Sequence, residues 1–147
     1  MPATNALEQL ARFKAQNTAL IPTLSLFTTV VLDPAVTARI VAAAVGQLKQ
    51  FSDNGGVVLF GTDIGFIQLY DTSKEVELMH RALSERQVLA SLTTNPATYF
   101  KAARKGRVEK GFDADLVVLD GDPTADVHNL AKVAYTIRAG QVIYQKR

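Results

Sequence analysis

The sequence predicts an α/β protein that carries a small all-β segment at its carboxyl end. Three observations predict this fold class. Helix-like and strand-like patterns alternate over the first half of the chain, which is typical of βα units around a parallel sheet. One short strand, Val57 to Phe60, is apolar throughout, as expected of a strand buried on both faces. After Arg104 the pattern changes to short strands and glycine turns, so we place a boundary near residue 103, between domains at 1–103 and 104–147.

Length and composition favour a globular protein. The chain has 147 residues, of which 48% are hydrophobic and 20% charged, enough to bury a core. The net charge of +2 is too small to predict nucleic acid or an anionic membrane as a partner. The absence of cysteine excludes disulfides and thiol chemistry. No apolar run reaches the roughly 18 residues of a membrane span, and the first residues lack a signal-peptide pattern, so we predict a cytoplasmic location.

The first elements read as a helix followed by a strand. Apolar residues recur at helical spacing from Leu7 to Phe13, and Asn17 provides a stop signal. The stretch from Thr18 to Leu26 is rich in apolar and β-branched residues, which predicts a strand. Pro22 cannot donate to a strand ladder, so it marks an end or a bulge.

A long amphipathic helix comes next. Asp33 offers a capping side chain and Pro34 suits the first helical position, so the helix begins there and runs to about Phe51. The turn from Ser52 to Gly56 then leads into the apolar strand. One face of this helix is predicted to be buried: Val36, Ile40, Val41, Ala44, Val45 and Leu48.

Three further helices are predicted before the boundary. Thr72 to Glu75 resembles a capping box and opens a helix to about Leu83. Ser84 to Gln87 is a second capping box, which opens a helix to about Thr94. Asn95-Pro96 starts a short third helix.

The tail is predicted to be all-β. A strand and turn are expected over Gly106 to Gly111, a strand over Ala114 to Leu119, and a turn over Gly121 to Pro123. The stretches Val133–Arg138 and Gln141–Tyr144 flank Ala-Gly and predict a hairpin.

The residues that carry chemistry follow the apolar strand. The strand ends on Gly61-Thr62-Asp63, and α/β folds place their reactive groups at the carboxyl ends of parallel strands. Asp63 is therefore the candidate catalytic carboxylate, with a helix cap or a buried hydrogen-bonded carboxylate as the structural alternatives. Tyr70 and Asp71 lie in the following loop, where they would contact a substrate or simply form a capped turn.

The remaining charged groups are assigned to the surface. His80 lies on a charged helix and His128 in a turn, so neither is expected to bind a metal. A cluster of five cations joins the two domains and lacks the interleaved aromatic residues of a nucleic-acid site. Four aspartates of the tail lack the spacing of a calcium loop and are read as turn residues. These two groups are Lys101, Arg104, Lys105, Arg107 and Lys110, and Asp113, Asp115, Asp120 and Asp122.

Several stretches resemble a known family. Residues 106–123 and 133–144 look like the closing signature of metal-dependent amidohydrolases. Gly61-Thr62-Asp63, Glu77-Leu78-Met79 and the stretch from Leu89 to Ala97 are similar to the same superfamily, in the same order. The nearest branch is the one that contains imidazolonepropionase-like and Xaa-Pro-dipeptidase-like proteins.

The resemblance covers residues 6–145, but only the carboxyl-terminal portion of the family's proteins. It implies a partial (β/α)₈ TIM barrel, with 19–26 and 57–63 as its last two strands, followed by a small β-sandwich tail. The family's metal centre uses a His-x-His pair, further histidines and the aspartate of the eighth strand, and only Asp63 has a counterpart here. Asp63 is thus implied to be a metal ligand and proton shuttle. A divalent metal, zinc, is expected in the complete protein, and none is expected to bind tightly to this chain alone.

The implied activity is metal-dependent hydrolysis of a C–N bond in a small-molecule amide or dipeptide. It belongs to a full-length parent, of which this chain would be an incomplete fragment that is inactive alone. Two alternatives stay open: a non-catalytic remnant or interaction module, and one half of a split hydrolase. Two buried strands leave open edges, so a complementing chain or a homo-oligomer is an expected partner.

Overall fold

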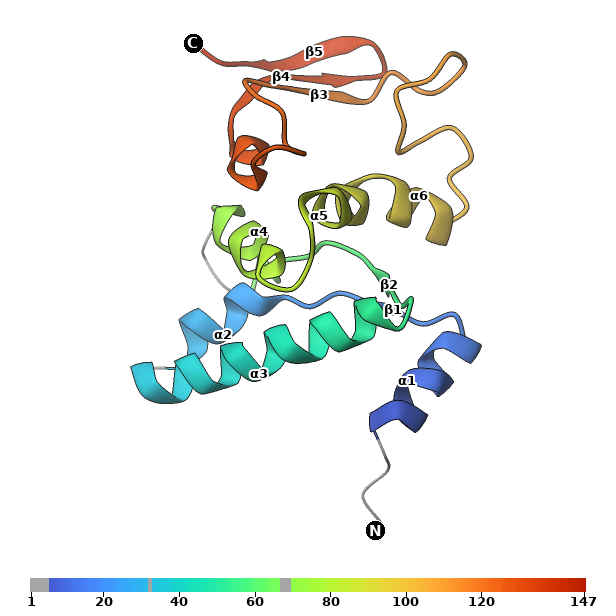
Figure 1. Cartoon of the computed structure of the whole chain (residues 1–147). Coiled ribbons are helices and arrows are strands. Elements are labelled where there is room, and N and C mark those ends of the chain that lie inside the picture. Colours follow the sequence, from blue (N-terminus) through green and yellow to red (C-terminus); the bar gives the residue numbers. More distant parts are fainter. Residues whose placement is uncertain (1–5, 32, 67–69) are drawn as a thin grey trace.

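The computed structural model of the chain describes residues 6–31, 33–66 and 70–147, and its α/β class agrees with the prediction. Helices surround two short parallel strands in the first hundred residues, and an antiparallel sheet follows (Figure 1). The described residues form no closed barrel, because they provide only one parallel pair of strands. The partial barrel stays a prediction about a larger protein.

The parallel pair is shorter than predicted. β1 (Ala19–Leu20) pairs with β2 (Val57–Val58) in parallel. One further hydrogen bond, from the amide of Leu59 to the carbonyl of Leu20 (2.9 Å), extends the ladder toward the carboxyl end. The two strands therefore end side by side, which places the segments after them at one edge.

The predicted strand over Thr18 to Leu26 is wrong beyond its first residues, where α2 (Leu24–Val30) forms instead. Thr23 adopts a left-handed conformation (φ 43°), which turns the chain out of the strand. The first two amides of α2 donate to the carboxylate of Glu75, 50 and 51 residues away, at 2.7 and 2.9 Å. A tertiary contact thus outweighs the local β preference of this stretch.

Two helices are confirmed. α1 (Ala6–Ala15) ends just before Asn17, whose φ of 50° is typical of a helix stop. α3 (Pro34–Asp53) begins after Asp33, which accepts hydrogen bonds from the amides two and three residues later, at 2.8 and 3.0 Å. No helix in the described part of the chain is both long and apolar enough to cross a membrane. The predicted buried face of α3 is confirmed as buried or half-buried: Val36, Ile40, Val41, Ala44, Val45 and Leu48.

The second capping box is confirmed. α5 (Glu85–Leu92) begins after Ser84, whose amide donates to Oε1 of Gln87 at 2.9 Å while the Gln87 amide donates to Oγ of Ser84 at 3.4 Å. α6 (Thr94–Tyr99) follows, one residue ahead of its predicted start.

The first capping box is wrong. α4 (Ser73–His80) forms as predicted, but the side chain of Thr72 makes no cap hydrogen bond. Asp71 caps the start of the helix instead, because its carboxylate accepts a hydrogen bond from the amide of Ser73 at 2.8 Å. Glu75 is turned into the interior and is unable to reach back to the helix start.

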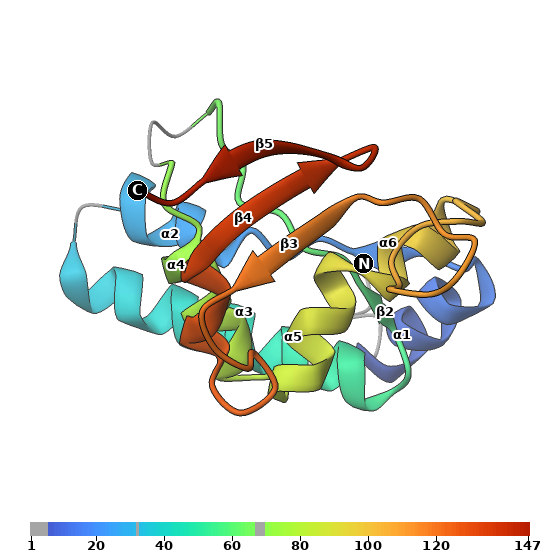
Figure 2. The ribbon, with the colours of Figure 1, turned by 90° about the horizontal axis from the view of Figure 1, so that it is seen from above.

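The tail contains a single sheet in the order β3-β4-β5 (Figure 2). Its strands are β3 (Leu116–Leu119), β4 (Val133–Arg138) and β5 (Gln141–Gln145), so the hairpin prediction is confirmed. The strand predicted over residues 106–111 is wrong, since this stretch consists of turns and bends. The described residues form no second sheet here, and the β-sandwich stays a prediction.

One apolar core unites the helices with the tail. The short 3₁₀ helix η1 (Val127–Ala131), which the sequence did not predict, packs on α4 (Figure 1). Val127 of η1 is buried in the same cluster as the helices. The boundary near residue 103 is a prediction that these contacts do not test. The buried members of the core are Leu24, Val41, Leu48, Phe51, Val58, Val76, Leu78, Met79, Leu83, Val88 and Val127.

Candidate functional site

The ends of the two parallel strands meet closely. β2 continues into Gly61, and β1 continues into Ile21. A Cβ atom placed on Gly61 would lie 2.4 Å from Cγ2 of Ile21, closer than real Cβ contacts allow. A side chain at position 61 would force Ile21 to shift, and glycine lets the strand ends approach without that change. This approach sets the position of the segment that leads to Asp63.

Asp63 lies at the carboxyl end of this segment, as predicted. Its backbone has a φ of 59°, an uncommon conformation for a residue other than glycine. A turn follows, in which the amide of Phe66 donates to the carbonyl of Asp63 at 3.2 Å. The side chain is exposed, and no hydrogen bond joins its carboxylate to another described residue. The alternative of a buried carboxylate is therefore wrong.

Tyr70 and Asp71 behave as loop residues. Tyr70 is exposed. The carboxylate of Asp71 accepts hydrogen bonds from the amide of Ser73 and, secondly, from its hydroxyl, and these lower the pKa of Asp71 below its ordinary value. Asp71 is thus an ionised cap at the start of α4. The predicted contact of both residues with a substrate is not tested by this geometry.

Glu75 is a buried carboxylate whose burial the sequence did not predict. Its side chain is 0% exposed, and its two carboxylate oxygens each accept one amide hydrogen bond from the start of α2. The contact ties the segment after β1 to the segment after β2. A signal was present, because Glu75 shares a helix face with Leu78 and Met79, three and four residues on, which are both buried.

The outer edge of β2 is covered by the junction between α5 and α6. The amide of Phe60 donates to the carbonyl of Ser91 at 3.1 Å. The side-chain amide of Asn95 donates to the carbonyl of Val58 at 2.9 Å. The open edge expected of an isolated parallel pair is therefore closed on this side by the chain itself.

The donor atoms present do not fit a metal. Within residues 6–31, 33–66 and 70–147, no group of three or more His, Cys, Asp or Glu side chains could hold an ion. Nδ1 of His80 lies 3.1 Å from the carbonyl oxygen of Leu83, at the end of α4. Nδ1 of His128 lies 2.7 Å from the carboxylate of Asp126. Asp63 alone supplies too few ligands for zinc, which takes three or four from the protein.

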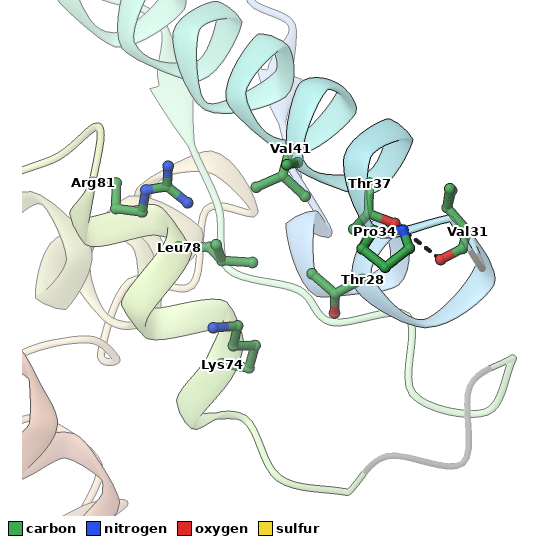
Figure 3. Close-up of a pocket in the computed structure, with 9 residues that line it drawn as sticks. Thr28, Val31, Pro34, Thr37, Val41, Lys74, Leu78 and Arg81 are labelled. Carbon is green, nitrogen blue, oxygen red and sulfur yellow. Dashed lines mark hydrogen bonds between the residues drawn. The ribbon is translucent and has the colours of Figure 1, made fainter.

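A shallow cleft of about 410 Å³ opens between α2, α3 and α4 (Figure 3). None of the three predicted site residues lines it. The hydroxyls of Thr28 and Thr37 donate to backbone carbonyls at 2.7 and 2.9 Å, and Lys74 pairs with Glu77 at 2.9 Å. Most polar groups of the cleft are thus occupied. It is lined by Thr28, Val31, Pro34, Thr37, Ala38, Val41, Lys74, Leu78 and Arg81.

The cations and aspartates of the domain junction pair with one another. Lys105 contacts the carboxylates of Asp115 and Asp113, and Arg104 lies 3.0 Å from Asp113. The hydrogen bond from Lys105 and then that from the amide of Ala139 lower the pKa of Asp115. Asp113 and Asp115 therefore flank β3 as predicted, and their ion pairs with Arg104 and Lys105 are a contact that the sequence did not predict.

Comparison with known families identifies the relatives of this chain. Residues 21–143 match the amidohydrolase family. Among curated proteins, the imidazolonepropionase of Thermoplasma acidophilum is 30% identical over 110 residues, and the match covers 70% of this chain. It covers 27% of that protein, so the chain spans about a quarter of its length.

Solved structures show the same fold. A Xaa-Pro dipeptidase with methionine bound in its active site superposes with a TM-score of 0.78 and 23% identity over 95% of this chain. A putative prolidase from Bifidobacterium longum superposes with a TM-score of 0.73 and 30% identity over 88% of the chain. In both cases the match covers 37% of the solved chain.

Proposed function

Because the chain belongs to the amidohydrolase family, we propose that the whole protein hydrolyses a C–N bond in a small-molecule amide or dipeptide. The family is generally metal-dependent, and zinc is the metal that we propose for the complete protein. The names of the similar imidazolonepropionase and Xaa-Pro dipeptidase support this class of substrate. This chain would supply the carboxyl-terminal part of the enzyme, in the cytoplasm.

The observation that carries the proposal is the position of Asp63. An exposed carboxylate follows a parallel strand at its carboxyl end, within the stretch that matches the family. This is where the loops of a (β/α)₈ barrel place reactive groups. In the proposed role, Asp63 accepts and returns a proton during hydrolysis. The other groups of the site, which this chain does not contain, would come from further segments or from a second chain.

A second candidate is a non-catalytic interaction module. It is supported by the closed outer edge of β2, where Ser91 and Asn95 occupy the main-chain groups that a neighbouring barrel strand would use. It is also supported by the shared core, to which the tail contributes Val127. Both features would allow the chain to fold without a partner.

The isolated chain is predicted to bind zinc no more tightly than about micromolar and to turn over no substrate, because one carboxylate is too few ligands. Calorimetric titration with zinc, together with a panel of dipeptides and N-acyl amino acids, measures both. The Asp63→Asn variant serves as the control and is expected to give the same weak isotherm. Tighter binding, or turnover that disappears in Asp63→Asn, would contradict the prediction and reveal a complete site.

Co-expression with the protein encoded immediately upstream tests the split hydrolase. We expect the two chains to copurify and to cleave a C–N bond that neither cleaves alone. Asp63→Ala should leave the association intact and remove turnover, since an exposed site carboxylate contributes to chemistry more than to packing. Asp53→Ala, at an exposed carboxylate that pairs with Lys49, should retain both. If no partner copurifies, the split hydrolase is rejected and the module is favoured.

A further inference from the structure

The carboxylate of Glu75 joins two helices that follow different strands of the parallel pair. Glu75 lies on α4, after β2, and accepts hydrogen bonds from the amides of Leu24 and Ser25, at the start of the helix that follows β1. These two helices, α2 and α4, pack on one another (Figure 1). The described residues alone bury the Glu75 side chain completely. The contact therefore does not depend on any segment outside this chain.

Glu75 satisfies amides that a neighbouring residue usually satisfies. The first amides of a helix normally donate to a Ser, Thr, Asp or Asn side chain at the N-cap position. Thr23 occupies this position in α2, and its side chain makes no cap hydrogen bond. The amides of Leu24 and Ser25 donate instead to a residue 51 and 50 positions away. A local cap would satisfy these amides equally well, but only a distant one also fixes α4 relative to α2.

A buried carboxylate is a costly way to join two helices. Taking a charge out of water is unfavourable, so apolar packing would join them at lower cost. Hydrogen bonds, in contrast, depend strongly on distance and angle. Both carboxylate oxygens of Glu75 are used, one for each of two adjacent amides. The contact is therefore suited to holding α2 and α4 in one relative position.

The segment between β1 and α2 also contacts the chain just before Asp63. A Cβ atom on Gly61 would lie 2.4 Å from Cγ2 of Ile21 and 3.8 Å from Cγ2 of Thr23. Asp63 is thus preceded by Gly61 and followed by α4, and both of these contact residues 21–25. The stretch that carries Asp63 therefore has the same support on both sides.

Uncommon backbone conformations occur on both strands' extensions. Thr23 has a φ of 43° and Asp63 a φ of 59°, and left-handed conformations are uncommon for residues other than glycine. Such conformations persist where the surrounding structure fixes them. The hydrogen bonds to Glu75 fix the two residues directly after Thr23. Their loss would allow Thr23 to relax, and its contact with Gly61 would change as well.

We propose that Glu75 is a positioning residue for Asp63. It holds residues 21–25 and α4 together, and this support sets the direction in which the chain leaves β2 toward Asp63. The inference rests on the proposed function, in which a carboxylate that transfers a proton has to be held in one place relative to its substrate. Glu75 touches no reacting group in this role and acts through the main chain.

Amide chemical shifts of the 147-residue chain test the proposal. Glu75→Gln removes the charge and one acceptor oxygen, whereas Glu75→Asp keeps the charge and draws the carboxylate back by one CH₂ group. We expect both variants to displace the amide resonances of Gly61, Asp63 and Phe66, whose amide donates to the carbonyl of Asp63 at 3.2 Å. A loss of stability alone would lower the melting temperature and leave these native-state resonances in place.

Val127→Ala is the matched control, because Val127 is 2% exposed and lies on η1, which packs on the same helix α4. It opens a cavity in the core and leaves the Glu75 carboxylate in place. The three resonances should keep their positions in this variant. The proposal is overturned if the Glu75 variants leave them in place, or if Val127→Ala displaces them as far. Displacement in Glu75→Gln alone would also overturn it, since it would reflect the lost charge and not a lost position.

The reverse measurement starts from the strand end. Gly61→Ala forces Ile21 to shift, so we expect the amide resonances of Leu24 and Ser25 to move. Gly46→Ala is the matched control, because a Cβ atom at that position would meet nothing within 4 Å. Resonances of Leu24 and Ser25 that stay unchanged in Gly61→Ala would contradict the coupling, whether or not the variants of the buried carboxylate fold.

Neither measurement requires a substrate or a metal. A negative result is therefore distinct from a failure of the proposed function, which Asp63→Ala tests through turnover in the whole protein. Unchanged resonances together with a loss of turnover would reject Glu75 as a positioning residue and keep the role of Asp63. Displaced resonances together with full turnover would support the positioning and reject the proposed role of Asp63.

Discussion

Replacing Glu75 with alanine is expected to lower the free energy of unfolding by about 3–5 kcal/mol. The side chain is fully buried, and its carboxylate accepts amide hydrogen bonds from Leu24 at 2.9 Å and from Ser25 at 2.7 Å. Removing it leaves two buried amide groups without a partner and opens a cavity beside α2. Both effects are costly in an apolar core. Urea unfolding followed by circular dichroism measures the change.

Two further substitutions sharpen this test. Glu77→Ala is the matched control on the same helix, because Glu77 is exposed and its ion pair with Lys74 lies on the surface. It should change stability by no more than about 0.5 kcal/mol. Glu75→Gln should fall between the two, since it keeps one acceptor oxygen and presents an NH₂ group to the second amide. Equal losses from Glu75→Ala and Glu77→Ala would show that the contact with α2 is not stabilising.

Replacing Val58 with aspartate is expected to prevent folding, with a loss of about 4 kcal/mol or more. Val58 is 4% exposed and packs in the core from β2. A charge at this position has no cation to pair with among the buried residues that the structure describes. Soluble yield and the far-ultraviolet spectrum report the result.

The control for this substitution is a valine on the other sheet. Val117 lies in β3 and is 57% exposed, so Val117→Asp places the same charge in water. It should keep the yield and the melting temperature close to those of the parent chain. If Val58→Asp melts like Val117→Asp, then β2 is not part of the stabilising core.

Helix boundaries were the most predictable part of the fold. The start of α3 follows from Asp33 and Pro34, and the start of α5 follows from Ser84 and Gln87. A cap and its partner amides lie within three residues of each other, so the interaction is already present in the local sequence. The hairpin of β4 and β5 was predictable for a similar reason, because Ala139 and Gly140 suit its two-residue turn.

Two of the wrong predictions concern stretches whose conformation depends on a residue far away in the sequence. The stretch that begins at Leu24 has strand-like residues, yet it is helical because Glu75 satisfies its first amides. The same glutamate was taken for part of a capping box, since its spacing from Thr72 was right. One long-range contact therefore explains both errors.

The location of Asp63 was predictable from the sequence, but the contacts around β2 were not. The apolar strand and the residues after it placed Asp63 at the carboxyl end of β2, and the structure shows an exposed carboxylate there. The closed outer edge of β2 was not predictable, because it depends on Asn95, which lies 37 residues away from Val58. The spacing of apolar residues predicts contacts only between residues that are close in the sequence.

The sequence by itself determined the α/β class, the caps of α3 and α5, the amphipathic face of α3, the tail hairpin and the family. These features rest on interactions within a few residues or on motifs that are read in order along the chain. Only the tertiary structure decided that Leu24–Val30 is a helix, that Glu75 is buried, and that the outer edge of β2 is closed. Each of these depends on whether buried polar groups far apart in the chain find partners, and burial exists only once the chain has folded.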